Sequence, residues 1–432
     1  MKKFVPILYV ISFIGIISSF GIFSILKEDE SISALENREL AQFPEWSWKA
    51  VWSGEYAQNI ESYVTDQLVG RSEMVELYDK QQSLLFESSL KIGNSLSGFL
   101  SQNKDLTREV EDGVVTEEIK KVGLNSLLVN KEWVISIFSA PFNQEGLDES
   151  IANLNALTEH ALSKDIEVFF VSPPYRYFGL WHMYPAEYQF TERKKEKDYF
   201  LSQVNEEIKV IDLLPFYKQF SEAEMESFYF KTDHHWNMRG AFFTYQTAIE
   251  EMSKRSTQFE DEPLQEEDVN IVEVPTGFFK GSINNNFRFV SAERLQQDQS
   301  LLYLPTSRYR LDQIRNSEGE LISDLSAEFG ILDEAEIPET YTYGNLYSPE
   351  KPTAYYYNEL AKNDVHLLVL KDSYFMPLLP FFVQHFKEVT VIDVRYHESI
   401  SMTKVIDEND FDMMMLFFHD NNLQGGSYLF EK

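Results

Sequence analysis

The residues of this chain best suited to chemistry lie in one short block, residues 230–237, which reads Phe-Lys-Thr-Asp-His-His-Trp-Asn. An Asp-x-His pair can supply the orienting acid and the general base of a serine hydrolase or acyltransferase. If the block is extended, Asp233 and His235 lie on one side of the backbone and His234 on the other. The spacing therefore predicts that Asp233 orients His235 as the base, and that His234 and Trp236 support the site.

The nucleophile that such a base requires is predicted at Ser373. The apolar run at residues 365–370 indicates a buried strand, and Lys371-Asp372-Ser373 follows it where a helix is expected to begin. Ligand sites of open α/β sheets lie at the carboxyl ends of strands, so we expect Ser373 to lose its proton to His235. The alternative is that Asp372 and Ser373 only cap the helix.

The histidine block has two other interpretations. Adjacent histidines beside a tryptophan can be hydrogen-bonded residues of a packed core. A metal-dependent hydrolase would use His234 or His235 as ligands, but no third histidine follows at ligand-like spacing. We therefore expect neither a metal nor another cofactor.

Arg395 is the predicted substrate-binding residue. It follows a predicted strand, residues 389–394, and should reach the same rim as Ser373, where a guanidinium can bind an acyl oxyanion or a glycan hydroxyl. The alternative for Arg395 is a salt bridge to Asp393 or Asp372.

Other candidates for substrate contact are a loop and a set of aromatic residues. Gly281 and Ser282, with the asparagines at 284–286, form either a substrate loop or a plain turn. Aromatic side chains can stack on sugar rings, and the candidates are Tyr175, Tyr177, Trp181 and Tyr374.

The elements that must position these residues alternate between strands and helices. Strands are predicted at residues 133–138, 166–171, 204–214, 365–370, 389–394 and 413–418, and helices at 150–162, 238–252 and about 374–386. This alternation predicts an α/β sandwich built on a mainly parallel sheet. Residues 256–353 are polar and weakly patterned, so we expect an irregular insertion there.

The N-terminus indicates where the protein resides. Two lysines precede an apolar run without charge at residues 4–26, which is long enough to span a bilayer. The lysines predict an N-terminus inside and the remainder outside the membrane, as a single-pass anchor, or a secreted protein if the segment is cleaved. The predicted parts are an anchor or signal segment at 1–27, a juxtamembrane linker with helices at 28–90, and the α/β domain at 91–432.

Composition excludes several classes of protein. The 432 residues are 43% hydrophobic, which is enough for a large core, and 70 acidic against 38 basic residues give a net charge of −32. Nucleic-acid binding requires clustered Lys and Arg, so we expect none. The chain has no cysteine, which excludes disulfides, a thiolate nucleophile and Cys-ligated zinc.

Several short blocks resemble one known family. The chain resembles the DHHW protein family, named for the motif at residues 233–236, and is more distantly similar to the SGNH-hydrolase-like alginate O-acetylation proteins. The resemblance runs from just after the anchor to near the C-terminus, and the order of the blocks is its specific part. The matching blocks are residues 36–44, 66–71, 278–282, 370–374 and 391–396.

The resemblance implies a function and a set of roles. Carried over by position, the Asp-x-His and Ser pattern of the alginate relatives gives Asp233, His235 and Ser373, in an order circularly permuted relative to ordinary SGNH hydrolases. It implies a three-layer SGNH-like sandwich and a serine-dependent O-acyltransferase, for acetyl above all, acting on a cell-surface or exported polysaccharide. The alternatives are an O-acetylesterase of the same fold and a non-catalytic assembly or glycan-binding protein.

The resemblance also has implications for partners and for the oxyanion hole. An enzyme of this kind would receive its acyl group through a membrane-bound O-acyltransferase partner. Lys371 stands where SGNH enzymes usually carry Gly before Asp-Ser. The candidates for an SGNH-type oxyanion Asn are Asn94 and Asn284.

Overall fold

The structure is a computed structural model that divides into two compact units, residues 1–102 and 103–432. It describes residues 27, 29, 32–33, 38–44, 46–48, 51, 55–68, 105–110, 113–121, 126–130, 132–137, 141–189, 191–274, 278–279, 281–283, 298, 301–305, 314–317, 319–322, 340–347, 351–397 and 399–432. The predicted anchor, the boundary between residues 90 and 91, and Asn94 and Asn284 all lie outside these residues. Within them, no helix is long and apolar enough to cross a membrane.

The described part of the first unit is small. Strands β1 (Ile32–Ser33) and β2 (Arg38–Glu39) pair antiparallel, and helix α3 (Glu55–Asp66) follows. The backbone N–H of Ala41 donates to the Asp66 carboxylate at 2.9 Å, and the Gln67 amide donates to the Ala41 carbonyl at 3.1 Å. These bonds tie the segment after β2 to the end of α3.

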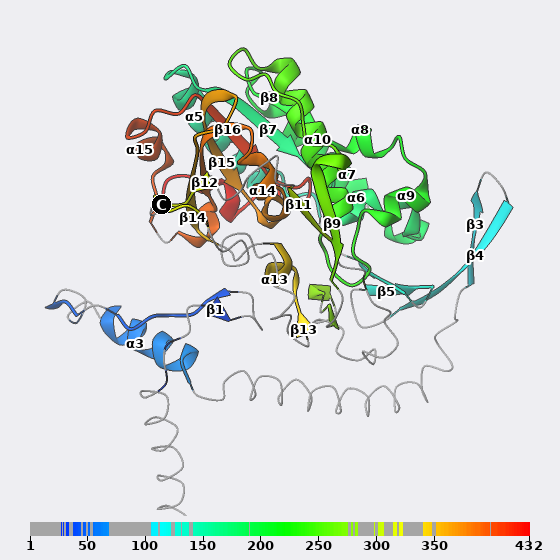
Figure 1. Ribbon diagram of the computed structural model, residues 1–432. Coiled ribbons are helices and arrows are strands. Elements are labelled where there is room, and N and C mark those ends of the chain that lie inside the picture. Colours follow the sequence, from blue (N-terminus) through cyan, green and yellow to red (C-terminus); the bar gives the residue numbers. More distant parts are fainter. Residues whose placement is uncertain are drawn as a thin grey trace, which may run out of the picture. The chain divides into compact units, whose positions relative to one another are not determined.

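The second unit is built on a seven-stranded sheet with the order β12-β14-β16-β15-β17-β7-β8 (Figure 1). Its strands are β7 (Glu167–Ser172), β8 (Lys209–Asp212), β12 (Ile314–Arg315), β14 (Thr353–Asn358), β15 (Asn363–Lys371), β16 (Phe386–Ile392) and β17 (Met413–Phe417). Every pair from β16 through β15, β17 and β7 to β8 is parallel, and β14 alone runs in the opposite direction, antiparallel to both of its neighbours, β12 and β16. The prediction of an α/β domain with a mainly parallel sheet is confirmed.

The sheet is covered on both faces, because its strands are apolar on both sides. On β15, Leu367 and Val369 belong to one buried cluster, and Leu368 and Leu370 to the other. Helices α10 (Met238–Arg255) and α14 (Leu379–Phe382) pack in the first cluster. Helices α5 (Gln144–Leu162), α7 (Thr191–Gln203) and α15 (Met402–Asp407) pack in the second. The result is three layers: helices, sheet, helices.

A second sheet adds an antiparallel meander, β3-β4-β5-β6. Its strands are β3 (Asp105–Val110), β4 (Gly113–Lys121), β5 (Ser126–Val129) and β6 (Trp133–Ser136). β6 was predicted as a buried strand, and its Trp133 and Ile135 do belong to the first buried cluster. The backbone N–H of Val134 donates to the Lys231 carbonyl at 3.1 Å, which links the meander to the Asp-His-His-Trp block.

The remaining elements are short, and the strands among them lie in the predicted irregular region. Two small pairs form there: β9 (Val269–Glu273) with β11 (Leu301–Pro305), and β10 (Phe278–Phe279) with β13 (Thr340–Tyr341). The short helices are α6 (Arg176–Gly179), η1 (Trp181–Met183), η2 (Ala186–Tyr188), α8 (Leu214–Tyr217), α9 (Glu222–Ser227), η3 (Glu266–Asp268), α13 (Tyr343–Tyr347), η5 (Ser373–Leu378), η6 (Val394–Tyr396) and η7 (Gly426–Tyr428).

Candidate active site

Three side chains predicted from the sequence form one hydrogen-bonded series. Asp233 Oδ1 lies 2.6 Å from His235 Nδ1, and His235 Nε2 lies 2.8 Å from Ser373 Oγ. The Asp233 and His235 side chains are more than nine-tenths buried, whereas Ser373 is partly exposed. This is the geometry of a carboxylate that orients an imidazole toward a hydroxyl which a substrate can reach.

The pair of Asp233 and His235 is made within one tight loop. The segment between Tyr229 and Trp236 is a series of bends closed by an antiparallel bridge between these two residues, and it is not extended. Asp233 Oδ1 also accepts the backbone N–H of His235 at 2.9 Å, which holds the carboxylate over the residue two positions later. The premise of strand alternation was therefore wrong, although Asp233 and His235 do meet. Asn237 then caps α10 by accepting from Arg239 N.

The electrostatics favour an ionised Asp233. Burial alone would raise the pKa of Asp233, but electrostatic interactions with the His235 and His234 rings and the hydrogen bonds from His235 and Ser282 bring it well below its usual value. The carboxylate is therefore charged whenever His235 acts as a base, and it can stabilise the imidazolium that forms.

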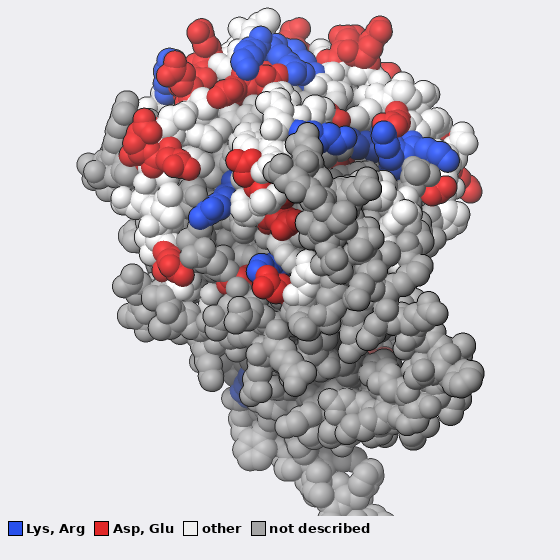
Figure 2. All heavy atoms as spheres, turned by 90° about the vertical axis from the view of Figure 1, so that its right-hand side faces the viewer, with Lys and Arg blue, Asp and Glu red and all other residues white. Residues whose placement is uncertain are grey.

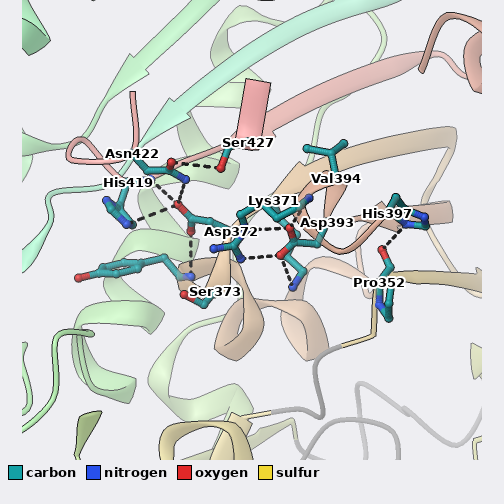
Figure 3. Close-up of polar contacts among 12 residues, drawn as sticks. Pro352, Lys371, Asp372, Ser373, Asp393, Val394, His397, His419, Asn422 and Ser427 are labelled. Carbon is teal, nitrogen blue, oxygen red and sulfur yellow. Dashed lines mark hydrogen bonds and ion pairs between the residues drawn. The ribbon is translucent and has the colours of Figure 1, made fainter. Parts of the chain in front are cut away.

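Asp372 fixes the turn that carries Ser373. Its Oδ1 accepts the N–H of Tyr374 at 2.9 Å, and its Oδ2 accepts from His419 N and Asn422 Nδ2, both at 3.0 Å (Figure 3). The cap predicted for this position is present, and it coexists with the bond between Ser373 and His235. The expected helix at 374–386 is instead a 3-10 helix, η5, and the short α14, since Pro377 and Pro380 interrupt regular bonding.

Lys371 and Arg395 share one buried carboxylate. Lys371 Nζ lies 3.4 Å from Asp393 Oδ2 (Figure 3). Arg395 donates from Nε and Nη2 to the same carboxylate at 2.9 and 2.6 Å. Burial raises the pKa of Asp393, but Arg395 and Lys371 bring it below its usual value. The predicted alternative for Arg395, a salt bridge to Asp393, is therefore present, and its role in binding substrate stays a prediction. Lys371 points to Asp393 and so leaves the Ser373 turn intact.

His234 has different hydrogen-bond partners from His235. Its Nδ1 lies 2.5 Å from the Ser282 hydroxyl, and its carbonyl accepts from the Tyr374 hydroxyl at 2.6 Å. Burial lowers the pKa of His234 to about 3, and repulsion from His235 adds to the effect, so the ring stays neutral. Trp236 is fully buried against Tyr374. The supporting roles predicted for both residues stay a prediction.

Gly281 and Ser282 form a backbone support for Asp233. The Ser282 N–H donates to Asp233 Oδ2 at 2.6 Å, and Ile283 N donates to the Thr232 carbonyl at 3.1 Å. A Cβ at Gly281 would stand 2.1 Å from Thr232 O. Only glycine allows so close an approach of the two segments.

We expect Gly281→Ala to displace the Ser282 N–H from Asp233. The clash with backbone atoms should destabilise the fold by roughly 1–3 kcal/mol and slow the labelling of Ser373 by a sulfonyl fluoride. Thermal unfolding and mass spectrometry measure the two effects. Gly426→Ala is the matched control, because the nearest atom to its added Cβ, Arg395 Cγ, is 4.0 Å away. Equal stability and labelling of both variants would contradict this role of Gly281.

Tyr343 is a site residue that the sequence analysis missed. Its ring stacks on His235 with centroids 3.7 Å apart and planes at 4°, and its hydroxyl donates to the Ser373 carbonyl at 3.3 Å. It lies in α13, inside the region predicted to be irregular. A single tyrosine in a chain with 23 of them gives no signal that could have found it.

The expected sugar-stacking aromatics are mostly unavailable. Tyr374 and Tyr177 are buried, and only Tyr175 and Trp181 are partly exposed. The prediction was therefore wrong for Tyr374 and Tyr177, because both rings pack in the core. Tyr175 packs 4.8 Å from His419, and burial raises the pKa of its hydroxyl to about 12.

The block also brings together three potential metal ligands. One ligand atom each of Asp233, His234 and His235 lie within 4.8 Å of one another. Asp233 already accepts three N–H groups, and His234 Nδ1 and His235 Nε2 are bonded to Ser282 and Ser373. A metal ion would have to break these bonds, so the donor set fits proton transfer better than coordination.

A mainly parallel sheet between helices, with an Asp-x-His loop facing a serine at a strand end, defines the SGNH-hydrolase-like class. Residues 137–358 match the family described as the SGNH hydrolase-like domain of acetyltransferase AlgX. The chain belongs to this family, and the resemblance expected from the sequence is confirmed.

Solved structures agree with this assignment. Two structures of Bacillus cereus PatB1, one without and one with a sulfonyl adduct, are 25% and 24% identical to this chain, with TM-scores of 0.60. They cover 73% and 71% of this chain and 100% of their own. A DHHW family protein from Eubacterium siraeum shares the fold at 16% identity and TM-score 0.54, over 72% of this chain and 95% of its own. Among curated proteins none matches this chain.

Proposed function

We propose that this protein is an extracytoplasmic, serine-dependent O-acyltransferase that moves an acetyl group onto a cell-surface or exported polysaccharide. The observation that carries the proposal is the continuous series Asp233, His235, Ser373, with bonds of 2.6 and 2.8 Å. Membership of a family described by an acetyltransferase domain supports acyl chemistry over other serine chemistry.

The mechanism follows from which atoms donate. His235 Nδ1–H donates to Asp233, which leaves Nε2 free to take the Ser373 proton as Oγ attacks the acyl carbonyl. The new C–O bond forms an acyl-serine, and the leaving group departs with the proton from His235. A sugar hydroxyl then gives its proton to His235 and attacks the acyl-serine; as the bond between the acyl carbon and Ser373 Oγ breaks, His235 returns the proton to Oγ.

A sulfonyl adduct on PatB1 supports a reactive nucleophile in this fold. Sulfonyl reagents form stable bonds with activated hydroxyl groups, so the same reagent is a direct probe of Ser373. The partly exposed Ser373 beside a buried base is the group in this chain that such a reagent should find.

The cellular setting is part of the proposal. The apolar residues 4–26 would anchor the chain with its N-terminus inside and the α/β domain outside, unless the segment is cleaved. A membrane-bound O-acyltransferase would deliver the acyl group from across the membrane, and the polysaccharide would be the acceptor. The anchor would hold Ser373 near both.

The test is acetyl transfer by the full-length protein in detergent. It is incubated with 4-nitrophenyl acetate, with and without oligosaccharides, and the products are separated by mass spectrometry. Acetylated oligosaccharide supports the transferase, whereas acetate alone supports an O-acetylesterase of the same fold. No turnover and no labelling by a sulfonyl fluoride would favour a non-catalytic envelope or glycan-binding protein.

We expect the ring of Tyr343 to matter more than its hydroxyl. Tyr343→Leu removes the surface on which His235 stacks and should lower kcat roughly tenfold or more at unchanged KM, while Tyr343→Phe keeps the stack and stays within a few-fold of wild type. Steady-state kinetics with 4-nitrophenyl acetate separate the two. Tyr347→Leu is the control, since Tyr347 packs on Tyr343 in the same helix. A larger loss of kcat in Tyr347→Leu than in Tyr343→Leu would contradict the assignment.

A further inference from the structure

Three buried cations of the second unit differ in how their charge is compensated. Lys197 lies 2.7 Å from Asp212 and 3.1 Å from Asp420, and Lys371 bonds to Asp393. Arg176 is only 3% exposed, yet it makes no ion pair among the described residues. Burying a charge is costly unless a counter-charge accompanies it. Arg176 is therefore the one of these three cations whose burial is not offset by a bonded carboxylate.

Arg176 is held by carbonyl groups instead. Its Nη1 donates to Val134 O at 2.5 Å and its Nη2 to Lys231 O at 2.8 Å, and the guanidinium lies 5.4 Å from the centre of the Trp133 ring. Its Nε is buried without a partner in the described part of the chain. The negative charge of Asp298 lowers the cost of burying the Arg176 charge. The oxygens of Asp298, however, accept hydrogen bonds from Lys231 and Thr232. Two of five guanidinium N–H groups are thus used, and the charge remains uncompensated by a bonded anion.

Arg176 lines a pocket beside the catalytic series. The pocket opens to solvent, and Tyr175, Arg193 and His234 line it as well. The ring of His234 lies 3.8 Å from that of His235, so the pocket adjoins the base. The acceptor proposed below would place one hydroxyl at Ser373 and a neighbouring group in this pocket.

A second guanidinium reaches the same pocket from α7. Arg193 is one-fifth exposed, and its Nη1 lies 3.6 Å from Glu196, which is too long for a strong bidentate bond. Lys194 and Lys195 follow it in the exposed part of the helix. Figure 2 shows Lys and Arg side chains among acidic ones on the face that lies to the right in Figure 1, where α6 to α9 are found.

We propose that the pocket of Arg176 and Arg193 binds an anionic group, a carboxylate or a phosphate, on the acceptor sugar. The proposal rests on the proposed function for the identity of the acceptor. A bound oxyanion would supply the counter-charge that Arg176 lacks and would accept a charge-assisted hydrogen bond from Arg193. The net negative charge of this chain repels polyanions, so an anionic polysaccharide binds only where nearby guanidinium groups outweigh that repulsion.

The test measures binding without turnover. Full-length Ser373→Ala protein is titrated, by ligand-detected NMR, with galactose, galacturonic acid and galactose 6-phosphate, which differ only at carbon 6, and with the matching glucose set. We expect at least one acidic sugar to bind roughly tenfold tighter than its neutral parent. A preference for the uronic acid identifies a carboxylate, and a preference for the sugar phosphate identifies a phosphate.

Two variants assign the preference to the pocket. In the Ser373→Ala background, Arg193→Gln should reduce the preference to less than about twofold. Lys195→Gln should retain it, since Lys195 is exposed on the same helix and its amine lies 3.8 Å from Glu192. Arg176 is left in place, because its bonds to Val134 and Lys231 support the fold. No acidic preference in either set, or a preference that survives Arg193→Gln, would overturn the proposal. Acetyl transfer without an acidic preference refutes the pocket alone, and an acidic preference without acyl chemistry refutes the proposed function alone.

Discussion

Ser373→Ala should abolish turnover of 4-nitrophenyl acetate, with kcat/KM lowered roughly 10⁴-fold or more, as for other serine nucleophiles held by a base. The same variant should no longer gain mass from a sulfonyl fluoride. Both results follow from the 2.8 Å bond between Ser373 Oγ and His235 Nε2, since the alanine offers no atom to deprotonate. Rates come from absorbance and labelling from intact-protein mass spectrometry.

Ser399→Ala is the control for this experiment. Ser399 is exposed, and its hydroxyl donates to the Lys432 carbonyl, with no contact to the series described above. Turnover and labelling should equal those of the wild type. If Ser373→Ala retained wild-type turnover, Ser373 would be excluded as the nucleophile.

Asp233→Asn should lower kcat roughly 10²- to 10⁴-fold with little change in KM. Asp233 accepts three N–H groups, two from His235 and one from Ser282. Asparagine has only one acceptor oxygen, so its NH₂ group would face one of these N–H donors, and His235 would lose the charge that stabilises its protonated form.

The chain offers a close control for Asp233→Asn. Asp261 Oδ2 also bonds to a histidine, His385 Nδ1, at 2.9 Å, and His385 Nε2 bonds to the Tyr245 hydroxyl at 2.6 Å. Asp261→Asn should reduce the free energy of unfolding but leave kcat within a few-fold of wild type. Equal losses of kcat in both variants would show that any disturbed Asp-His pair inactivates the protein, and Asp233 would lose its assigned role.

The sheet and its main helices could be predicted from the sequence because their periodicity is strong. Residues 413–418 are a continuous apolar run and residues 365–370 are apolar except for His366, and the structure places β17 and β15 there, at the centre of the sheet. The predicted helix at 238–252 is α10, which extends to Arg255. The elements within residues 256–353 could not be predicted. The strands there are two to five residues long, which is too short to show a recognisable alternation of apolar and polar residues.

The site was predicted in part, and the reasons differ from residue to residue. Ser373 follows a clear strand, so its place at a sheet edge could be inferred. Asp233 and His235 were paired on the premise of an extended segment, whereas a side chain to backbone bond in a bent loop joins them. The stack of Tyr343 on His235 is a contact across more than a hundred residues, and no local pattern encodes it.

The loop that carries Asp233 and His235 determines how much of the site depends on residues that are distant in sequence. Acid and base are assembled by neighbours two positions apart, so only one bond of the series, from His235 to Ser373, spans the 138 residues between them. The loop therefore needs only one further residue, a serine at the end of a strand, to complete the series. The position of this serine along the chain therefore does not alter how Asp233 and His235 meet.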